Sequence, residues 1–232
     1  MSILQLLDVL LPSVCVLCRR AVHGRKPLCF SCEIHLPKNT QACVRCAMPL
    51  AVATPMCASC MQTPPVFTRA FCAFRYEEPI AGLLNRYKHS GHTASGYWLA
   101  RSFAQGVQAH YQTANIALPE CVLPVPLHWR RLQRRGFDQG REIARVLARQ
   151  LRLPLLATLR RQRYTVSQQG LSRAQRHRNL QDAFVLHKPL PYRRVAVVDD
   201  VLTTGSTATE IARVLQAAGA AEVHVWALAR TP

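Results

Sequence analysis

The C-terminal third of the chain carries a clear alternation of apolar strands and an amphipathic helix. Residues 193–198 and 222–228 are short apolar runs rich in β-branched residues, and residues 206–218 between them have apolar side chains at helical spacing. Gly219 ends this helix, since glycine adopts the left-handed conformation that often follows a helix C-terminus. A strand, a helix and a second strand at this spacing predict a parallel βαβ unit.

Further strands and helices are predicted upstream of this unit. Residues 67–76 alternate apolar and polar positions and are rich in aromatic rings, and residues 120–125 are mostly apolar, so both are predicted strands. Residues 80–87 and 94–111 are predicted helices. Residues 138–151 are predicted to form a third helix, because an aspartate suited to capping precedes apolar side chains at a spacing of four. This order of elements predicts an α/β domain with a parallel sheet flanked by helices.

The first 60 residues have a different pattern, with few large apolar side chains and many cysteines. Eight of the ten cysteines form four CxxC pairs, and each pair starts 14 residues after the one before it. In a CxxC pair two thiolates converge on one metal ion, and two pairs supply the four sulfur ligands of a closed zinc site. The predicted ligands of two structural Zn²⁺ ions are therefore Cys15, Cys18, Cys29, Cys32, Cys43, Cys46, Cys57 and Cys60.

The even spacing leaves the pairing of these cysteines open. Sequential pairing gives two small zinc ribbons in series, whereas interleaved pairing gives a cross-braced module; we favour the sequential arrangement. A disulfide framework is an alternative, but no export signal is recognised, and a CxxC redox couple does not require four evenly spaced pairs. Because this segment has few large apolar residues, metal must supply much of its folding free energy. Cys72 and Cys121 stand alone among apolar neighbours and are predicted core thiols.

The boundary between the two regions is predicted at the Thr-Pro-Pro run of residues 63–65. Residues 1–64 then form the metal module, and residues 65–232 form the larger domain. Residues 3–11 are mostly apolar but lack a basic leader and are far shorter than a membrane span, so we expect a short amphipathic helix and no integral membrane segment. A cytoplasmic protein is expected, with peripheral contact at the inner membrane as an alternative.

Arginine dominates the charge of the chain. The 232 residues carry a formal net charge of +18, and 26 of the 30 basic residues are Arg. Residues 130–178 alone hold 14 Arg against two acidic residues. The planar guanidinium binds phosphate oxygens in pairs, so this excess favours phosphate or nucleic-acid partners. The alternative is a solvated basic surface that only keeps the protein soluble.

The most informative segment follows the strand predicted at residues 193–198. Two acidic residues, Asp199 and Asp200, end the apolar run, and a turn rich in hydroxyl groups and glycine opens the next helix. The acids then point into the crevice where α/β sheets bind ligands, and the N–H groups that start the helix can hold a phosphate. Carboxylates accept hydrogen bonds from sugar hydroxyls, so the segment predicts a sugar-phosphate site. The alternative, a capping box of Thr207 and Glu210, leaves the paired acids unexplained.

Residues 197–207, with the sequence VVDDVLTTGST, closely resemble the 5-phosphoribosyl 1-pyrophosphate (PRPP) signature of type I phosphoribosyltransferases. Three further motifs accompany it: LPVPL at residues 123–127, RRGFDQ at residues 134–139 and LSRAQRHRNL at residues 171–180. Together with the CxxC pairs, they make the whole chain resemble the ComF family, in particular the enterobacterial ComF/GntX type linked to DNA utilisation. The resemblance implies a type I phosphoribosyltransferase-like parallel sheet behind an N-terminal double zinc ribbon.

The resemblance also implies a PRPP site. Asp199 and Asp200 would contact the ribose hydroxyls and act as the catalytic carboxylates, and the turn after them would hold the 5-phosphate. The implied PRPP-binding residues are Asp199, Asp200, Val201, Leu202, Thr203, Thr204, Gly205, Ser206 and Thr207. The implied pyrophosphate loop is Pro124, Val125, Pro126 and Leu127, and the implied lid carries Arg163, Arg173, Arg176 and Arg178. Mg²⁺ is implied with PRPP, bound largely through the ligand's own oxygens.

Three functions are consistent with this site. An active phosphoribosyltransferase of nucleotide metabolism would release pyrophosphate from PRPP, although no segment identifies its acceptor. A DNA-handling protein would hold single-stranded DNA on the Arg-rich face and act with the DNA-uptake machinery. Aromatic rings suited to base stacking are Tyr97, Trp98, Trp129, Phe137 and Tyr164. A non-catalytic regulator would bind PRPP and change a partner's affinity. The sequence favours a ComF-like protein that binds PRPP and takes part in DNA uptake or utilisation, and it leaves catalysis open.

Overall fold

The computed structural model describes residues 13–22, 26–90, 93–162 and 182–232. Its centre is a four-stranded parallel sheet in the order β3-β8-β7-β4, so the predicted βαβ unit supplies the two central strands. The strands span Arg69–Arg75 (β3), Cys121–Pro124 (β4), Arg194–Leu202 (β7) and Glu222–Arg230 (β8). The predicted parallel sheet is confirmed.

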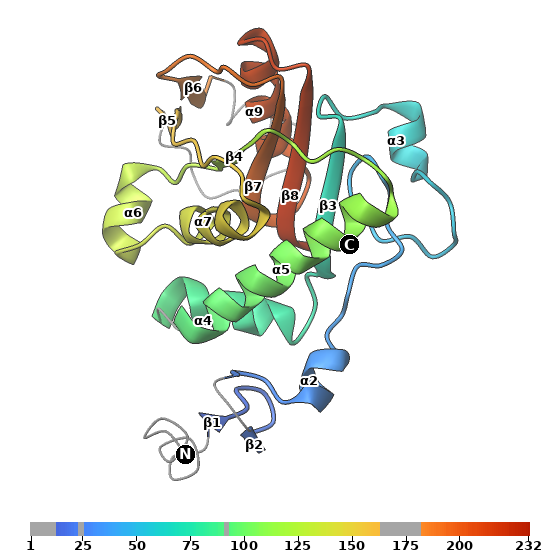
Figure 1. Cartoon of the computed structure of the whole chain (residues 1–232), viewed down its shortest axis with the longest axis vertical. Coiled ribbons are helices and arrows are strands. Elements are labelled where there is room, and N and C mark those ends of the chain that lie inside the picture. The colour runs from blue at the N-terminus through green and yellow to red at the C-terminus, as the bar shows by residue number, and fades with distance from the viewer. Residues whose placement is uncertain (1–12, 23–25, 91–92, 163–181) are drawn as a thin grey trace.

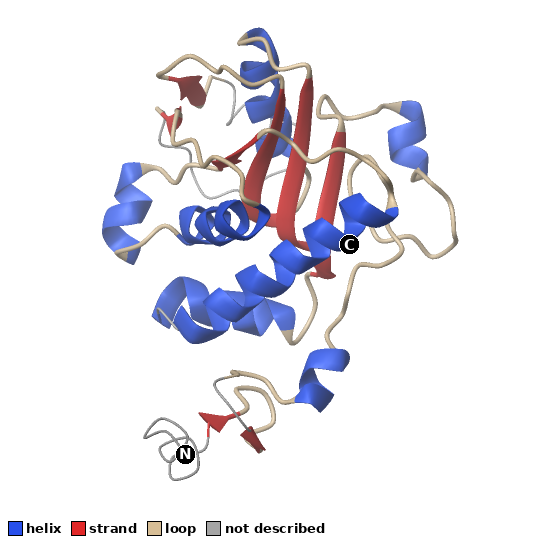
Figure 2. Ribbon diagram, in the orientation of Figure 1, coloured by secondary structure: helices blue, strands red, loops and turns tan. Residues whose placement is uncertain are grey.

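Helices cover both faces of the sheet (Figures 1 and 2). On one face α7 packs on β4 and β7, and α5 packs on β3 and β8, while α4 packs on α5. On the opposite face α9 packs on β8. The helices span Ile80–Ser90 (α4), Thr93–Thr113 (α5), Gln139–Leu151 (α7) and Ser206–Ala217 (α9). Flanking helices are therefore confirmed.

The central strands are buried on both faces, which explains their continuous apolar sequence. Along β7, Val195 and Val197 belong to the apolar cluster that includes Ile211 of α9, while Ala196 and Val198 belong to the cluster on the other face. The alternation follows from the two-residue period of a strand. The lone thiols Cys72 and Cys121 are 1% and 0% exposed, which confirms them as core residues.

Three elements of the larger domain were not predicted. The short helix α6 (Trp129–Arg135) follows the loop after β4, and His128 caps it by accepting a hydrogen bond from the Arg130 N–H at 3.3 Å. A two-stranded antiparallel pair joins β5 (Leu159–Arg161) to β6 (Phe184–Leu186). Each of these elements is too short and too rich in Arg, or too interrupted, to give a periodic apolar pattern.

The cysteine-rich segments occupy two different places. Three short elements, β1 (Ser13–Val14), β2 (Ala21–Val22) and α2 (Phe30–Ile34), lie near the N-terminal end and below the sheet in Figure 1, whereas α3 (Ala58–Gln62) lies on the β3 side. The chain between them runs along the outer edge of β3. There the Asn39 N–H donates to the Ala73 carbonyl at 2.9 Å, and the Arg75 N–H donates to the Pro37 carbonyl at 2.8 Å.

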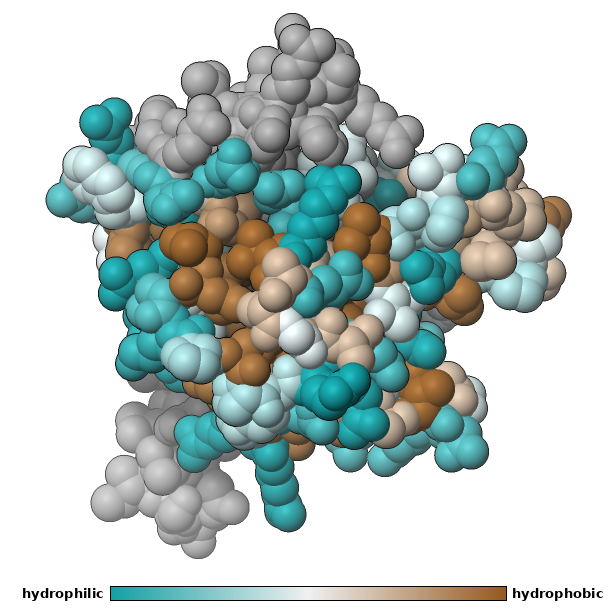
Figure 3. Space-filling view, turned by 90° about the horizontal axis from the view of Figure 1, so that it is seen from above, coloured by the Kyte–Doolittle hydropathy of each residue, from teal (hydrophilic) through white to brown (hydrophobic). Residues whose placement is uncertain are grey.

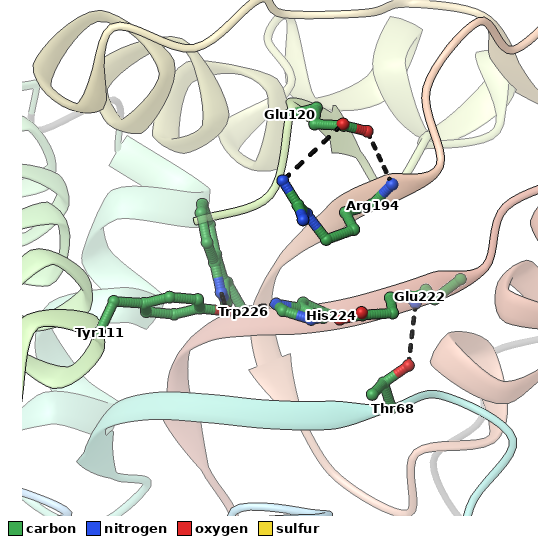
Figure 4. A network of polar contacts seen from close by, with 8 residues as sticks. Thr68, Tyr111, Glu120, Arg194, Glu222, His224 and Trp226 are labelled. Carbon is green, nitrogen blue, oxygen red and sulfur yellow. Dashed lines mark hydrogen bonds and ion pairs between the residues drawn. The ribbon is translucent and has the colours of Figure 1, made fainter. Parts of the chain in front are cut away.

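A network of polar side chains joins the points where the strands begin (Figure 4). Before β4, Glu120 accepts a hydrogen bond from the Arg194 N–H at 2.9 Å, at the start of β7. Within the core, the Tyr111 hydroxyl of α5 contacts His224 Nδ1 and accepts from Trp226 Nε1 at 2.9 Å. His224 Nε2 also lies 3.1 Å from the Glu222 carboxylate. These contacts fix α5 and the strand starts to one another.

The surface is mixed in character. Viewed from above (Figure 3), hydrophilic side chains occupy much of the periphery, and apolar side chains are exposed between them. None of the helices that the structure describes is both long enough and apolar enough to cross a membrane. The helix predicted near the N-terminus, at residues 3–11, lies outside the described residues.

Candidate functional site

The acidic pair, Asp199 and Asp200, lies inside β7 rather than after it. The strand was predicted to stop at residue 198, but its ladder with β8 continues, with Asp199 in register with Ala227 and Leu202 in register with Arg230. Both carboxylates are half-buried at the carboxyl end of a central strand. Such a position at the end of a parallel sheet is where α/β proteins bind ligands.

Two residues from distant parts of the chain converge on Asp200. Lys88 of α4 places its Nζ 2.9 Å from Asp200 Oδ2, and the Gln139 side chain at the start of α7 donates to the same oxygen at 3.1 Å. Asp199 instead accepts a hydrogen bond from the Asp200 N–H at 2.8 Å. Sequence reasoning missed Lys88 and Gln139. Only the RRGFDQ motif, which ends at Gln139, carried a signal for either of them.

These contacts separate the two carboxylates electrostatically. Burial raises the pKa of Asp199 to about 8, and the adjacent Asp200 carboxylate adds to the shift. Burial also opposes ionisation of Asp200, but the Lys88 ammonium and the hydrogen bonds from Lys88 and Gln139 outweigh it, so the pKa of Asp200 lies below its ordinary value. The two opposite shifts favour a state in which the pair shares one proton and one negative charge, with the charge held near Lys88 on Asp200.

The turn after β7 presents hydroxyl groups and backbone N–H groups. Thr203 and Thr204 are exposed, and Thr204 Oγ1 lies 2.8 Å from Ser206 Oγ. Gly205, with φ of 76°, occupies the position before α9, where a left-handed backbone favours glycine. This residue starts the helix without a side-chain cap. The first N–H groups of α9 are thus oriented toward the turn, and the helix dipole favours an anion there.

The capping-box alternative for this helix is wrong. Gly205, not Thr207, is the capping residue. The Glu210 carboxylate instead accepts a hydrogen bond from the Asp182 N–H at 3.2 Å and forms an ion pair with Arg213 at 3.2 Å. Glu210 therefore ties α9 to the chain near residue 182.

The segment Pro124–Leu127 lies beside the acidic pair. Pro124 is in register with Val198 of β7, and the Val125 N–H donates to the Val198 carbonyl at 2.9 Å. These contacts bring the predicted pyrophosphate loop, residues 124–127, to the same end of the sheet as the acids. The four arginines assigned to a lid, at positions 163, 173, 176 and 178, lie outside the described residues.

Eight thiols form two groups of four. The first cysteine cluster is Cys15, Cys18, Cys29 and Cys32, and the second cysteine cluster is Cys43, Cys46, Cys57 and Cys60. Within each cluster the four Sγ atoms lie within 4.8 Å of one another. Four thiols at such separations match the donor set of a closed tetrahedral zinc site, which needs no other ligand. The sequential arrangement is thus confirmed, and these are two zinc-binding sites with four cysteine ligands each.

The cysteines form no disulfide bonds, and one thiol in each cluster has a lowered pKa that favours the metal-binding thiolate. All ten cysteines are free, which contradicts the disulfide alternative. Burial would raise the pKa of Cys15, but hydrogen bonds from the backbone N–H groups of Cys18, Cys29 and Leu17 outweigh it and lower this pKa to about 6. Burial likewise opposes ionisation of Cys43, whose pKa the backbone of the second cluster lowers to about 7. One thiol in each cluster, Cys15 or Cys43, therefore ionises to the thiolate near neutral pH.

Comparison with known proteins agrees with this architecture. Residues 6–61 match the family model of the double zinc ribbon domain, and residues 138–232 match that of the phosphoribosyl transferase domain. The second match spans α7, β7, α9 and β8, which carry the acidic pair and the turn. The fold and these sites define a protein with a phosphoribosyltransferase domain behind a double zinc ribbon.

Similarity to whole proteins identifies the family. The chain is 35% identical over 225 residues to competence protein F of Haemophilus influenzae, covering 93% of this chain and 96% of that protein. It is also 35% identical over 224 residues to the DNA utilization protein YhgH of Escherichia coli K12, covering 94% and 90%. YhgH of Salmonella typhi is similar to the same degree over 219 residues. The chain belongs to the ComF family.

Proposed function

We propose that the protein binds PRPP with Mg²⁺ at the carboxyl end of its sheet and takes part in DNA uptake or utilisation. The observation that carries the first part is the convergence of the acidic pair, a hydroxyl-rich turn and a helix N-terminus at the carboxyl end of β7. The relatives named competence protein F and DNA utilization protein support the second part.

Each part of PRPP has a matching group in this site. The acidic pair accepts hydrogen bonds from the ribose hydroxyls, and the turn from Thr203 to Thr207 donates hydroxyl and N–H groups to the 5-phosphate. Residues 124–127 face the pyrophosphate, and the arginines at positions 163, 173, 176 and 178 neutralise it. Mg²⁺ would supply charge neutralisation of the pyrophosphate oxygens.

The acidic pair also suits the chemistry of PRPP. Loss of pyrophosphate leaves positive charge on the ribose, which a nearby carboxylate stabilises. Asp200 can supply this carboxylate, because Lys88 and Gln139 lower its pKa and so favour its ionised form. Pyrophosphate release measured across a panel of acceptors tests whether the protein uses PRPP as a phosphoribosyltransferase or only binds it.

Calorimetric titration of Mg²⁺ and PRPP into the zinc-loaded protein tests the proposed site. We expect binding by the wild type and none by the Asp199→Asn, Asp200→Asn double variant. Glu142→Gln is the matched control, because it removes one exposed acid whose partner is Arg145, one turn along the same helix. Absence of binding by the folded wild type contradicts the proposal, as does equal binding by the double variant.

A single-stranded DNA surface has support from α6. Trp129 is 56% exposed, and the Arg130 guanidinium lies 5.3 Å from the centre of its ring, so a stacking face adjoins a cation. Tyr97 and Arg101 form a similar pair at 5.9 Å. We expect Trp129→Ala to weaken binding of an oligonucleotide, whereas Phe30→Ala, which removes an exposed ring near the first cysteine cluster, leaves it unchanged. Affinity that does not fall with added salt contradicts a basic DNA surface.

The remaining assignments follow from the same proposal. We place the boundary between the zinc module and the phosphoribosyltransferase domain at residues 64 and 65. We further propose that the protein works in the cytoplasm, in contact with the DNA-uptake machinery, and peripheral contact at the inner membrane is the alternative. Cell fractionation with and without a high-salt wash tests this location.

A further inference from the structure

The two cysteine clusters have the same CxxC spacing, and both pack against the larger domain, but they differ in their hydrogen bonds to it. Residues 13–35, around the first cluster, form hydrogen bonds only with partners in residues 13–36, as far as the structure describes them. The second cluster is different. Next to it the Val44 carbonyl accepts from the Ala70 N–H of β3 at 3.3 Å, and the Cys46 carbonyl accepts from Arg230 Nε at 3.0 Å.

Arg230 is the residue that connects the second cluster with the site. It is the last residue of β8 and is 5% exposed. While Nε binds the Cys46 carbonyl, Nη1 donates to the Leu202 carbonyl at 3.1 Å and also to the carbonyls of Thr203 and Thr231. One rigid guanidinium thus joins a zinc-ligand residue to the first residues of the turn that precedes α9.

The second cluster and the turn also enclose a common space. A cavity of about 630 Å³ separates them. Its lining includes Met48, Cys57 and Ser59 on the cluster side and Thr204, Ser206 and Thr231 on the other side. The wall that faces the turn is therefore a part of the zinc ribbon.

We infer that zinc in the second cluster, and not in the first, controls ligand binding at the Thr203–Ser206 turn, with Arg230 as the positioning residue. The inference rests on the proposed binding of PRPP at that turn. Cys46 would hold zinc through its thiolate, which would fix the position of its carbonyl, and that carbonyl orients the Arg230 guanidinium. The guanidinium in turn holds the carbonyls of Leu202 and Thr203, which sets the backbone that presents N–H groups to the phosphate.

A matched pair of variants separates the two clusters in the full-length protein. Cys15→Ser and Cys43→Ser each remove a buried first cysteine of one cluster, and neither residue lines the cavity near the turn. We expect each variant to lose one zinc ion by metal analysis. Cys43→Ser is expected to weaken PRPP binding at least about tenfold, whereas Cys15→Ser stays within about twofold of the wild type. Equal losses in both variants, or none in Cys43→Ser, overturn the inference.

A second variant tests the link without removing metal. Arg230→Lys keeps the charge but cannot reach the four carbonyls with one planar group. We expect two zinc ions to remain and PRPP affinity to fall by about tenfold. Wild-type affinity in this variant overturns the role of Arg230.

Hydrogen exchange separates this inference from the proposed function. In the absence of ligand, we expect peptides covering residues 201–211 to exchange faster in Cys43→Ser and Arg230→Lys than in Cys15→Ser and the wild type. If the wild type binds no PRPP, the proposed function fails, but this difference in exchange still supports the link. Equal exchange in all four proteins overturns the link whether or not PRPP binds.

Discussion

The two ends of the parallel sheet use polar residues in different ways. At the end where the strands begin, Glu120, Arg194, Tyr111, His224 and Glu222 bind one another or nearby backbone, and Trp226 completes the group. At the end where the strands finish, two carboxylates lie side by side with their pKa values shifted in opposite directions. Exposed hydroxyl groups follow them. Most polar groups at the first end bind each other, whereas those at the second end leave capacity for a ligand.

This comparison indicates that one end of the sheet serves mainly stability and the other mainly binding. This network stabilises the sheet because most of its buried polar atoms have a partner, although Arg194 Nε has none among the described residues. An adjacent pair of half-buried acids costs stability, and proteins keep such pairs mainly where they bind or catalyse. We therefore expect substitutions at the first end to change stability and substitutions at the second end to change binding and its pH dependence.

The largest effect is expected from Trp226→Ala, which empties a fully buried position of β8. Its cost is expected to be about 3–5 kcal/mol of unfolding free energy.

Tyr111→Phe isolates the polar part of the network, since it leaves the Trp226 N–H without its acceptor, and should cost about 1–3 kcal/mol of unfolding free energy. Urea unfolding measures both. A loss of PRPP affinity in the folded Tyr111→Phe protein contradicts the separation of the two ends.

The next largest effect is expected from Lys88→Gln at the other end. It removes the cation that keeps Asp200 ionised and should cost about 2–3 kcal/mol at pH 7, because the pair is mostly buried. The pKa of Asp200 is lowered in the folded protein, so this contribution is present above the ordinary pKa of Asp and is lost as pH falls through the folded value. Unfolding at pH 7 and at a pH below 3.8 tests this, with Lys188→Gln as a control on a surface lysine. A cost that does not shrink with falling pH contradicts the ion pair.

Asp199→Asn is expected to stabilise the protein. The folded-state pKa of Asp199 is about 8 against an ordinary 3.8, so the native carboxyl keeps its proton while the unfolded one loses it, and stability falls as pH rises between these values. The asparagine variant lacks this loss, so its unfolding free energy relative to the wild type should rise from pH 4 to pH 8. Wild-type PRPP affinity should rise with pH through about 8. The same rise in the variant would show that Asp199 is not its source.

The smallest effect is expected from Glu120→Gln. Hydrogen bonds from the Arg194 and Arg193 N–H groups lower the pKa of Glu120, so its contribution is present above the ordinary pKa of Glu and is lost as pH falls through the folded value. We expect a small decrease in the urea midpoint at pH 7 that disappears in acid, with unchanged PRPP affinity. A larger effect on binding than on the midpoint would place Glu120 among the ligand-binding residues.

Much of the fold could be predicted because its elements are long and periodic. The helix predicted at residues 138–151 forms as α7, with Asp138 accepting a hydrogen bond from the Arg141 N–H at 3.0 Å. The strand predicted at residues 193–198 is correct but too short. Acidic residues disfavour strands in isolation, and here pairing with β8 decides the outcome.

The partners of the acidic pair could not be predicted, because contacts between distant segments leave no periodic trace. Gln139 reaches Asp200 across 61 residues of sequence, and Arg230 reaches Cys46 across 184. The helix predicted at residues 80–87 stopped one residue before Lys88, although α4 continues to Ser90. The eight zinc-binding cysteines could be predicted, because the CxxC spacing that indicates a metal site is a local sequence pattern.

The chain between the two cysteine clusters has a consequence for solubility. β3 is an edge strand, and residues 37–39 occupy its open hydrogen-bonding side through contacts with Ala73, Phe74 and Arg75. On the opposite edge, residues 154–156 do the same for Val122 of β4. Unpaired strand edges recruit strands from other molecules. A chain shortened to begin at residue 65 would lack residues 37–39 and expose the β3 edge. We therefore expect the zinc module to reduce edge-to-edge aggregation as well.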